Sequence, residues 1–166
     1  MSDESQDPAG DEAARPRSGP APGGQRVAVI IPAKDEQERI AATVRSARAI
    51  PHVDLVLVVD DGSSDETQHV ARSAGAVVVR HSVNRGKASA METGAVVVAM
   101  RDNPGAAARL LLFLDADLGD TAVNAAPLVP PVLAGKADCS IAVLPTQAGA
   151  AGRGLVTGLA RRSIQR

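Results

Sequence analysis

Short apolar segments alternate with amphipathic segments along the chain from residue 26 onward. Five runs of strand length are almost wholly apolar, at 27–31, 55–59, 76–79, 110–114 and 140–143, and helical patterns lie between them at 36–49, 65–74, 87–101 and 121–134. Strands that are apolar at every position indicate burial on both faces, as in a parallel sheet covered by helices. The pattern therefore predicts an α/β fold with a mostly parallel sheet, built from strand–helix–strand units.

The two ends of the chain depart from this alternation. Residues 1–25 are rich in Pro, Gly, Ser and acidic residues, and because such a composition buries little apolar surface, we expect a disordered tail there. We expect one domain over 26–143 and a separate C-terminal segment over 144–166. Within the domain, the prolines Pro127, Pro130 and Pro131 predict that the last helix is irregular, and Cys139 is expected to begin a buried strand.

Composition restricts the core and excludes several classes of function. Hydrophobic residues make up 45% of the chain, yet Phe113 is the only aromatic residue, so the core must consist of small and β-branched side chains. A platform that stacks single-stranded bases needs aromatic rings. The net charge of −1 provides no basic face that could follow a nucleic-acid backbone. We therefore expect no nucleic-acid partner.

Targeting signals and cysteine usage indicate a cytoplasmic protein. The N-terminus is acidic and lacks the apolar region of a secretory signal, and no apolar run approaches the ~18 residues of a transmembrane helix. The single cysteine, Cys139, excludes an intramolecular disulfide and suits a reducing compartment. A basic amphipathic stretch at 155–166 is typical of a solvated helix, and peripheral contact with a membrane surface is the alternative.

Polar residues cluster where the predicted strands end. Ligands of open α/β sheets bind outside the carboxyl ends of the strands. Four successive strands end in segments that carry acids, glycines and lysines, namely 32–36, 60–65, 81–87 and 115–117. The sequence therefore predicts a ligand site at this edge of the sheet.

Asp115 and Asp117 follow the fourth strand directly. At strand spacing, side chains two residues apart point the same way. Carboxylate oxygens are hard ligands that suit Mg²⁺ or Mn²⁺ held jointly by a protein and a diphosphate. The alternative is a pair of solvated acids near the start of the next helix.

The second strand is followed by adjacent carboxylates, Asp60 and Asp61. Gly62 permits a tight turn, and Ser64 or Asp65 can cap the next helix, but capping leaves the two adjacent acids unexplained. An imide N–H of a nucleobase or a ribose hydroxyl is the kind of donor that a carboxylate accepts from. We therefore expect Asp61 to contact a nucleoside.

Lys87 follows Gly86 at the start of a predicted helix, where the helix dipole favours anions over cations. A lysine in that position suggests an anionic ligand, with a solvated lysine as the alternative. A P-loop is excluded, because His81 and Ala88 stand where it needs glycine and Ser or Thr. The three histidines, including His81, show neither metal-ligand spacing nor a nucleophile partner.

Together, these segments resemble the nucleotide-sugar-binding half of GT-A glycosyltransferases, particularly family 2. The resemblance rests on four strings in register: 27–36 (VAVIIPAKDE), 58–65 (VVDDGSSD), 84–87 (NRGK) and 113–117 (FLDAD). Polyprenyl-phosphate sugar transferases and glucosyl-3-phosphoglycerate synthases are similar at these positions. The resemblance implies a Rossmann-like GT-A domain.

The resemblance also implies a role for each matched residue. The nucleotide-sugar-binding residues would be Pro32, Ala33, Glu36, Asp61, Gly62, Ser63, Gly86, Lys87 and Asp115. Asp117 would be the direct metal ligand, and Asp115 would reach the ribose or a metal-bound water. The implied reaction transfers a sugar from a UDP- or GDP-sugar to an unknown acceptor with Mg²⁺ or Mn²⁺, and the sequence specifies neither sugar nor base.

The implied family differs from this chain in length. Its members normally continue into an acceptor-binding half that carries the general base, whereas only 49 residues follow Asp117 and none after Asp138 is acidic. We therefore expect donor recognition without acceptor chemistry, so a non-catalytic nucleotide-binding module is one alternative. A haloacid-dehalogenase-type phosphatase is a weaker one, because Gly119 stands where its motif wants Thr or Val. A sugar-nucleotide pyrophosphorylase would need a glycine-rich loop after the first strand.

Overall fold

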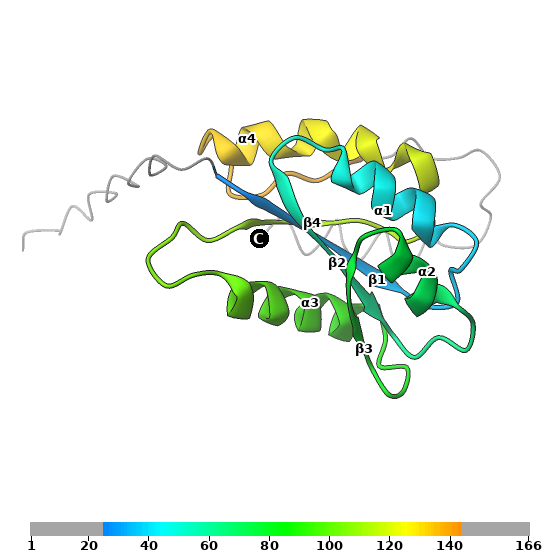
Figure 1. Cartoon of the computed structure of the whole chain (residues 1–166). Helices are drawn as coiled ribbons and strands as arrows, with labels where there is room; N and C mark the ends of the chain where they lie inside the picture. Colours follow the sequence, from blue (N-terminus) through cyan, green and yellow to red (C-terminus); the bar gives the residue numbers. More distant parts are fainter. Residues whose placement is uncertain (1–24, 144–166) are drawn as a thin grey trace, which may run out of the picture.

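A computed structural model describes residues 25–143 as an alternation of strands and helices. The elements are β1 (Val27–Ala33), α1 (Ile40–Arg48), β2 (Val53–Asp60), α2 (Thr67–Ser73), β3 (Val77–Arg80), α3 (Lys87–Arg101), β4 (Leu110–Phe113), the 3₁₀ helix η1 (Gly119–Leu128) and α4 (Val129–Leu133) (Figure 1). The predicted tail up to residue 24 and the segment 144–166, with its amphipathic stretch, lie outside the described residues.

The four strands form one parallel sheet in the order β3-β2-β1-β4. β1 lies in the interior of the sheet, and its first five residues, 27–31, are fully buried. The apolar run of β1 therefore marks a strand covered on both faces, as predicted, whereas Leu111 and Phe113 of the edge strand β4 are 41% and 39% exposed. The α/β fold with a parallel sheet is confirmed.

Helices cover the two faces of the sheet unequally. α3 lies against one face, whereas α1, α2, η1 and α4 lie against the other (Figure 1). On the α3 side, Ala28 and Ile30 of β1 pack with Ala90 and Val98. A Cβ atom on Gly94 of α3 would lie 2.4 Å from Cγ2 of Ile30, so glycine allows the helix to approach the sheet closely. The core consists largely of aliphatic and β-branched side chains, as the composition predicts.

Two of the helices begin later than the sequence pattern predicts. α3 spans 87–101 as predicted, but α1 begins at Ile40 and α2 at Thr67, later than the predicted starts at 36 and 65. Residues 37–39 form a turn before α1. In the last helical segment, Pro127 lies inside a 3₁₀ helix, and α4 has a proline in its first turn. The irregularity predicted from the prolines is confirmed.

The prediction of a fifth strand at 140–143 is wrong. These residues have no regular secondary structure, and Ile141 and Val143 are 77% and 91% exposed. Cys139, which was expected in the core, is also exposed. A short apolar run becomes a strand only where it has a neighbouring strand to pair with, and this run has none among residues 25–143.

Charged side chains meet at the amino ends of the strands, at the edge opposite the predicted ligand site. The guanidinium of Arg109 donates to both carboxylate oxygens of Asp54, from Nε at 2.8 Å and from Nη2 at 2.9 Å. It also pairs with Asp102, and Arg26 lies near both acids. The side chain of Arg109 is only 12% exposed. This cluster ties the loop after α3 to the start of β4.

We expect Arg109→Met to lower the free energy of unfolding by about 2 kcal/mol at neutral pH, because partly buried carboxylates lose a charged donor. The backbone N–H and the guanidinium of Arg109 lower the pKa of Asp102. A carboxylate with a lowered pKa stabilises the folded state above its unfolded-state pKa, and this contribution is lost as the pH falls through the folded-state pKa. Urea unfolding followed by circular dichroism should therefore show a smaller difference between wild type and variant at about pH 3. An undiminished difference in acid would contradict this account.

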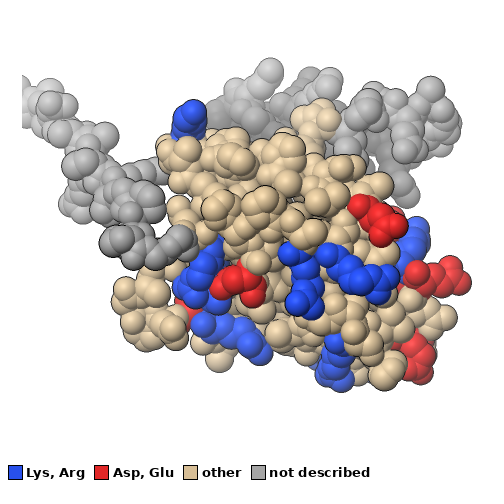
Figure 2. All heavy atoms as spheres, turned by 45° about the horizontal axis from the view of Figure 1, so that its top comes forward, with Lys and Arg blue, Asp and Glu red and all other residues tan. Residues whose placement is uncertain are grey.

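In the lower part of the face seen in Figure 2, Lys and Arg lie close to Asp and Glu, whereas the upper part is largely uncharged. Within residues 25–143, no helix is both long enough and apolar enough to cross a membrane.

Candidate functional site

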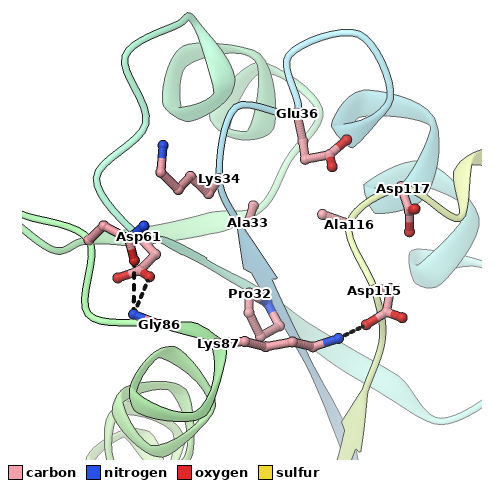
Figure 3. A pocket seen from close by; sticks show the side chains of 11 residues that line it. Pro32, Ala33, Lys34, Glu36, Asp61, Gly86, Lys87, Asp115, Ala116 and Asp117 are labelled. Carbon is pink, nitrogen blue, oxygen red and sulfur yellow. Dashed lines mark hydrogen bonds and ion pairs between the residues drawn. The ribbon is translucent and has the colours of Figure 1, made fainter. Parts of the chain in front are cut away.

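A cavity of about 400 Å³ opens at the carboxyl ends of β1, β2 and β4 and beside the start of α3 (Figure 3). Its lining consists of Pro32, Ala33, Lys34, Glu36, Asp61, Asn84, Gly86, Lys87, Asp115, Ala116 and Asp117. Four of these side chains are carboxylates and two are lysines. Three segments far apart in the sequence therefore supply acids to one cavity, at the edge of the sheet that the sequence predicts.

Most of the predicted site residues line this cavity. Gly62 and Ser63, in the loop after β2, do not line it. Sequence reasoning missed Lys34, Asn84 and Ala116 as lining residues. Each of them lies in one of the four segments that follow the strands and were predicted to form the site. Their positions therefore indicated a place in the site, although their residue types did not.

The loops after β1 and β2 are joined by hydrogen bonds. Asp35 has a φ of 54°, a conformation that Asp tolerates better than most residues. It accepts the backbone N–H of Ser64 at 2.8 Å, and its own N–H donates to Oγ of Ser63 at 2.9 Å. Its ion pair with Lys34, together with the bonds from Ser64, lowers the pKa of Asp35 to about 2. The two loops thus hold one another at the rim of the cavity.

The adjacent acids after β2 have different partners. Asp60 is fully buried, and its Oδ1 accepts the backbone N–H of Ser63 at 3.0 Å. Its Oδ2 lies 3.5 Å from Nε of Arg80 on the neighbouring strand. Asp65 accepts the N–H of Thr67, the first residue of α2, at 3.0 Å, but the N-cap residue of this helix is Glu66 and not Ser64 or Asp65 as predicted. Asp60 and Asp65 therefore build the loop and leave Asp61 facing the cavity.

Asp61 is almost buried and is held by donors from the protein. Its Oδ1 accepts from Nδ1 of His81 at 2.7 Å and from the N–H of Arg85 at 2.8 Å, and its Oδ2 accepts from the N–H of Gly86 at 2.7 Å. Burial alone would raise the pKa of Asp61, but these donors outweigh it and lower the pKa. The placement of this carboxylate is thus explained in part by the protein itself, which the sequence reasoning did not foresee.

The carboxylates after β4 are exposed, but β4 ends at Phe113 and Asp117 lies in a turn, so the two acids are not related by strand spacing. Leu114 and Ala116 are buried, whereas the side chains of Asp115 and Asp117 are 56% and 53% exposed. Lys87 forms an ion pair with Asp115, as Figure 3 shows (Figure 3). The lysine at the start of α3 therefore faces an anion of the protein itself.

The turn that carries Asp117 is fixed by α1. Thr43, a fully buried residue of α1, donates from Oγ1 to the backbone oxygen of Ala116 at 2.7 Å. The same oxygen atom of Thr43 accepts the N–H of Gly119 at 2.8 Å. Both sides of Asp117 are thus tied to one buried hydroxyl. A second cation, Arg39, approaches Asp117 from the turn before α1, with 3.9 Å between Nη1 and Oδ2.

The donor atoms at the rim fit a divalent cation shared with a ligand. No group of three or more potential metal-ligating side chains occurs among residues 25–143, so the described part of the chain holds no complete protein cage. Mg²⁺ commonly takes one or two carboxylates from a protein and the rest of its ligands from phosphates and water. Asp115 and Asp117 supply this kind of partial set.

Comparison with known proteins connects this geometry to a family. The model of glycosyl transferase family 2 matches residues 28–153, which include all four strands and the whole cavity. The chain belongs to glycosyl transferase family 2. The family resemblance and the fold class inferred from the sequence are therefore confirmed.

The chain is also similar to parts of longer proteins. The chain is 41% identical over 96 residues to succinoglycan biosynthesis protein ExoU of Rhizobium meliloti. This match covers 55% of this chain and 26% of that protein. It is 30% identical over 117 residues to glucosyl-3-phosphoglycerate synthase of Mycolicibacterium smegmatis, covering 69% and 37% respectively. The chain thus spans less than half the length of either relative.

A solved structure with similar architecture contains ligands. Glucosyl-3-phosphoglycerate synthase from Mycobacterium tuberculosis, crystallised with Mn²⁺, UDP and glucosyl-3-phosphoglycerate, matches with a TM-score of 0.51 and 28% identity. The match covers 66% of this chain and 40% of that one. The same enzyme in complex with UDP alone gives a TM-score of 0.53.

Proposed function

We propose that the cavity binds the nucleoside diphosphate of a UDP- or GDP-sugar together with Mg²⁺ or Mn²⁺, as the donor site of a glycosyltransferase with an unidentified acceptor. Residues 26–143 would form the donor-binding domain. One observation carries the proposal: the exposed Asp115 and Asp117 stand on the rim of the same cavity as the nearly buried Asp61. A single ligand could therefore contact both the metal site and the nucleoside-binding carboxylate.

The charge of the cavity supports a metal-dependent ligand. Its four carboxylates outnumber the two lysines, so a diphosphate alone would meet like charges. Asp115 and Asp117 would hold a divalent cation, whose charge would offset this repulsion. When bound, such a cation would act as a Lewis acid that stabilises the leaving nucleoside diphosphate.

Different residues of the cavity would contact different parts of the ligand. Pro32, Ala33 and Glu36 would line the nucleoside end, where Oδ2 of Asp61 keeps an acceptor position beyond its bond to Gly86. Lys87 would exchange its ion pair with Asp115 for a phosphate oxygen, since a flexible ammonium group serves both partners. Gly62 and Ser63 would shape the loop without touching the ligand. The UDP and Mn²⁺ in the M. tuberculosis synthase support the class of ligand that we propose.

Calorimetric titration with UDP, GDP and uridine, each with and without Mn²⁺, tests the proposal. We expect Mn²⁺ to tighten the binding of UDP or GDP by at least about tenfold, because the cation contacts both the carboxylates and the phosphates. Uridine lacks phosphates, so Mn²⁺ should not change its affinity. Equal affinity of the diphosphates with and without Mn²⁺ would exclude the proposed site. Release of glucose from UDP-glucose, or its transfer, would then separate an enzyme from a non-catalytic nucleotide-binding module.

A further inference from the structure

A buried histidine lies directly behind the cavity. His81 follows the last residue of β3, and its side chain is only 5% exposed. Both ring nitrogens have partners: Nδ1 lies 2.7 Å from Oδ1 of Asp61, and Nε2 lies 2.9 Å from Oγ1 of Thr93 in α3. The ring is thereby fixed between the acid of the cavity and the helix that begins at its edge.

The partners of the ring define its hydrogen-bonding roles. An ionised carboxylate only accepts hydrogen bonds, so Nδ1 must carry the proton toward Asp61. In the neutral ring, Nε2 is then an acceptor, and the hydroxyl of Thr93 donates to it. Orientation of an imidazole through its second nitrogen is a common way to fix what the first nitrogen does. Thr93 therefore holds the ring so that its donor faces Asp61.

The hydrogen bond from Nδ1 of His81 fixes the orientation of the Asp61 carboxylate relative to the cavity. Oδ1 takes both the His81 ring and the N–H of Arg85, whereas Oδ2 takes only the N–H of Gly86. The two bonds at Oδ1 prevent the carboxylate from rotating. One acceptor position of Oδ2 is thus left for a ligand. Without the ring, a single backbone N–H would remain at each oxygen, and the carboxylate could turn away from the cavity.

We propose that His81 is a positioning residue of the nucleotide site, which fixes the carboxylate of Asp61 for a donor group of the nucleoside. The inference rests on the proposed function. It assigns no contact between His81 and the ligand, because the ring is buried behind Asp61. Its prediction is specific: nucleoside affinity depends on a donor at the position of Nδ1.

Two variants with an amide side chain distinguish the roles of the two ring nitrogens of His81. The side-chain nitrogen of Asn stands as many bonds from Cβ as Nδ1 of His does, and that of Gln stands as many as Nε2. His81→Asn therefore keeps a donor for Asp61, whereas His81→Gln moves the donor toward Thr93. We expect His81→Gln to weaken uridine and UDP binding by about tenfold, the effect of losing one hydrogen bond to a charged group. His81→Asn should stay within about threefold of wild type.

Calorimetric titration with uridine and UDP, and melting followed by circular dichroism, measure these variants, with His69→Gln at an exposed position of α2 as the matched control. The ratio of UDP affinities with and without Mn²⁺ should equal that of wild type, because His81 has no contact with Asp115 or Asp117. A histidine that only stabilises the core would instead give losses that follow the melting temperature, irrespective of which nitrogen is kept. Thr93→Val provides a second route if His81→Gln does not fold, with an expected loss of about threefold.

The outcomes distinguish this inference from the proposed function. If wild type does not bind the nucleotides, the proposed function fails and the inference fails with it. If wild type binds them and folded His81→Gln binds equally well, only the inference is overturned. The same holds if His81→Gln is unfolded and Thr93→Val binds like wild type.

Discussion

Asp117→Ala is expected to abolish the gain in UDP affinity that Mn²⁺ provides, a loss of at least about tenfold, since removing even an outer-shell partner of a metal costs about 10- to 100-fold. Asp117 is the exposed carboxylate whose turn is fixed on both sides by Thr43. Its only recorded partner among residues 25–143 is Arg39, at 3.9 Å. Removal of the side chain therefore leaves no buried group without a partner, and stability should change by less than about 0.5 kcal/mol.

The measurement is a titration with UDP in the presence and absence of Mn²⁺, on wild type and variant. Asp120→Ala is the matched control, because it removes an acid three positions further along that is exposed and lies outside the cavity. The control should keep the full effect of Mn²⁺. Binding of uridine should be the same in all three proteins. If Mn²⁺ strengthens UDP binding to Asp117→Ala as much as to wild type, Asp117 does not hold the cation.

Gly62→Ala is expected to damage both the fold and the cavity. Gly62 has a φ of +76°, and a Cβ atom there would lie 2.8 Å from the backbone N of Asn84 and 2.9 Å from the carbonyl carbon of Val83. Backbone atoms cannot rotate away as a side chain would, so the segment after β3 must shift. Left-handed strain and overpacking together should cost about 3 kcal/mol. Because the displaced segment leads to Arg85 and Gly86, whose N–H groups donate to Asp61, UDP affinity should fall by at least about tenfold.

Gly105→Ala separates the two causes of this loss. Gly105 also has a positive φ, of +93°, but a Cβ atom there would meet nothing within 4 Å. This control should show the strain alone, about 1 kcal/mol in urea unfolding, with UDP binding unchanged. Equal losses of stability in the two variants would show that the contact with Val83 and Asn84 is relieved at no cost.

The fold was predictable from the sequence because the apolar runs are continuous and regularly spaced. The helix starts were less predictable, because residues 36 and 37 are held by bonds from their backbone N–H groups to the side chains of Thr67, the first residue of α2, and Asp65, in the loop before it. Such bonds between loops leave no periodic pattern. The run at 140–143 shows the reverse problem, since an apolar pattern cannot reveal whether a partner strand exists.

The edge of the sheet that carries the site was predictable from where the polar segments follow the strands. The partners of Asp61 were not, because they depend on the strand order. Asp60 pairs with Arg80 in the register of β2 and β3, which brings the next residues, Asp61 and His81, side by side. Each of them stands one position after its strand, so the sequence held this signal, but only the order β3-β2-β1-β4 makes the two strands neighbours.

The aliphatic core gives this protein an unusual optical property. The chain has no Trp or Tyr, and Phe113 is its only aromatic residue, so its own absorbance and dichroism in the near ultraviolet are very weak. Intrinsic fluorescence cannot report unfolding or binding. A nucleobase, in contrast, absorbs strongly in this spectral window. A pyrimidine or purine fixed beside Asp61 would therefore produce an induced dichroic band on an almost empty background, which would report occupancy of the cavity without any label.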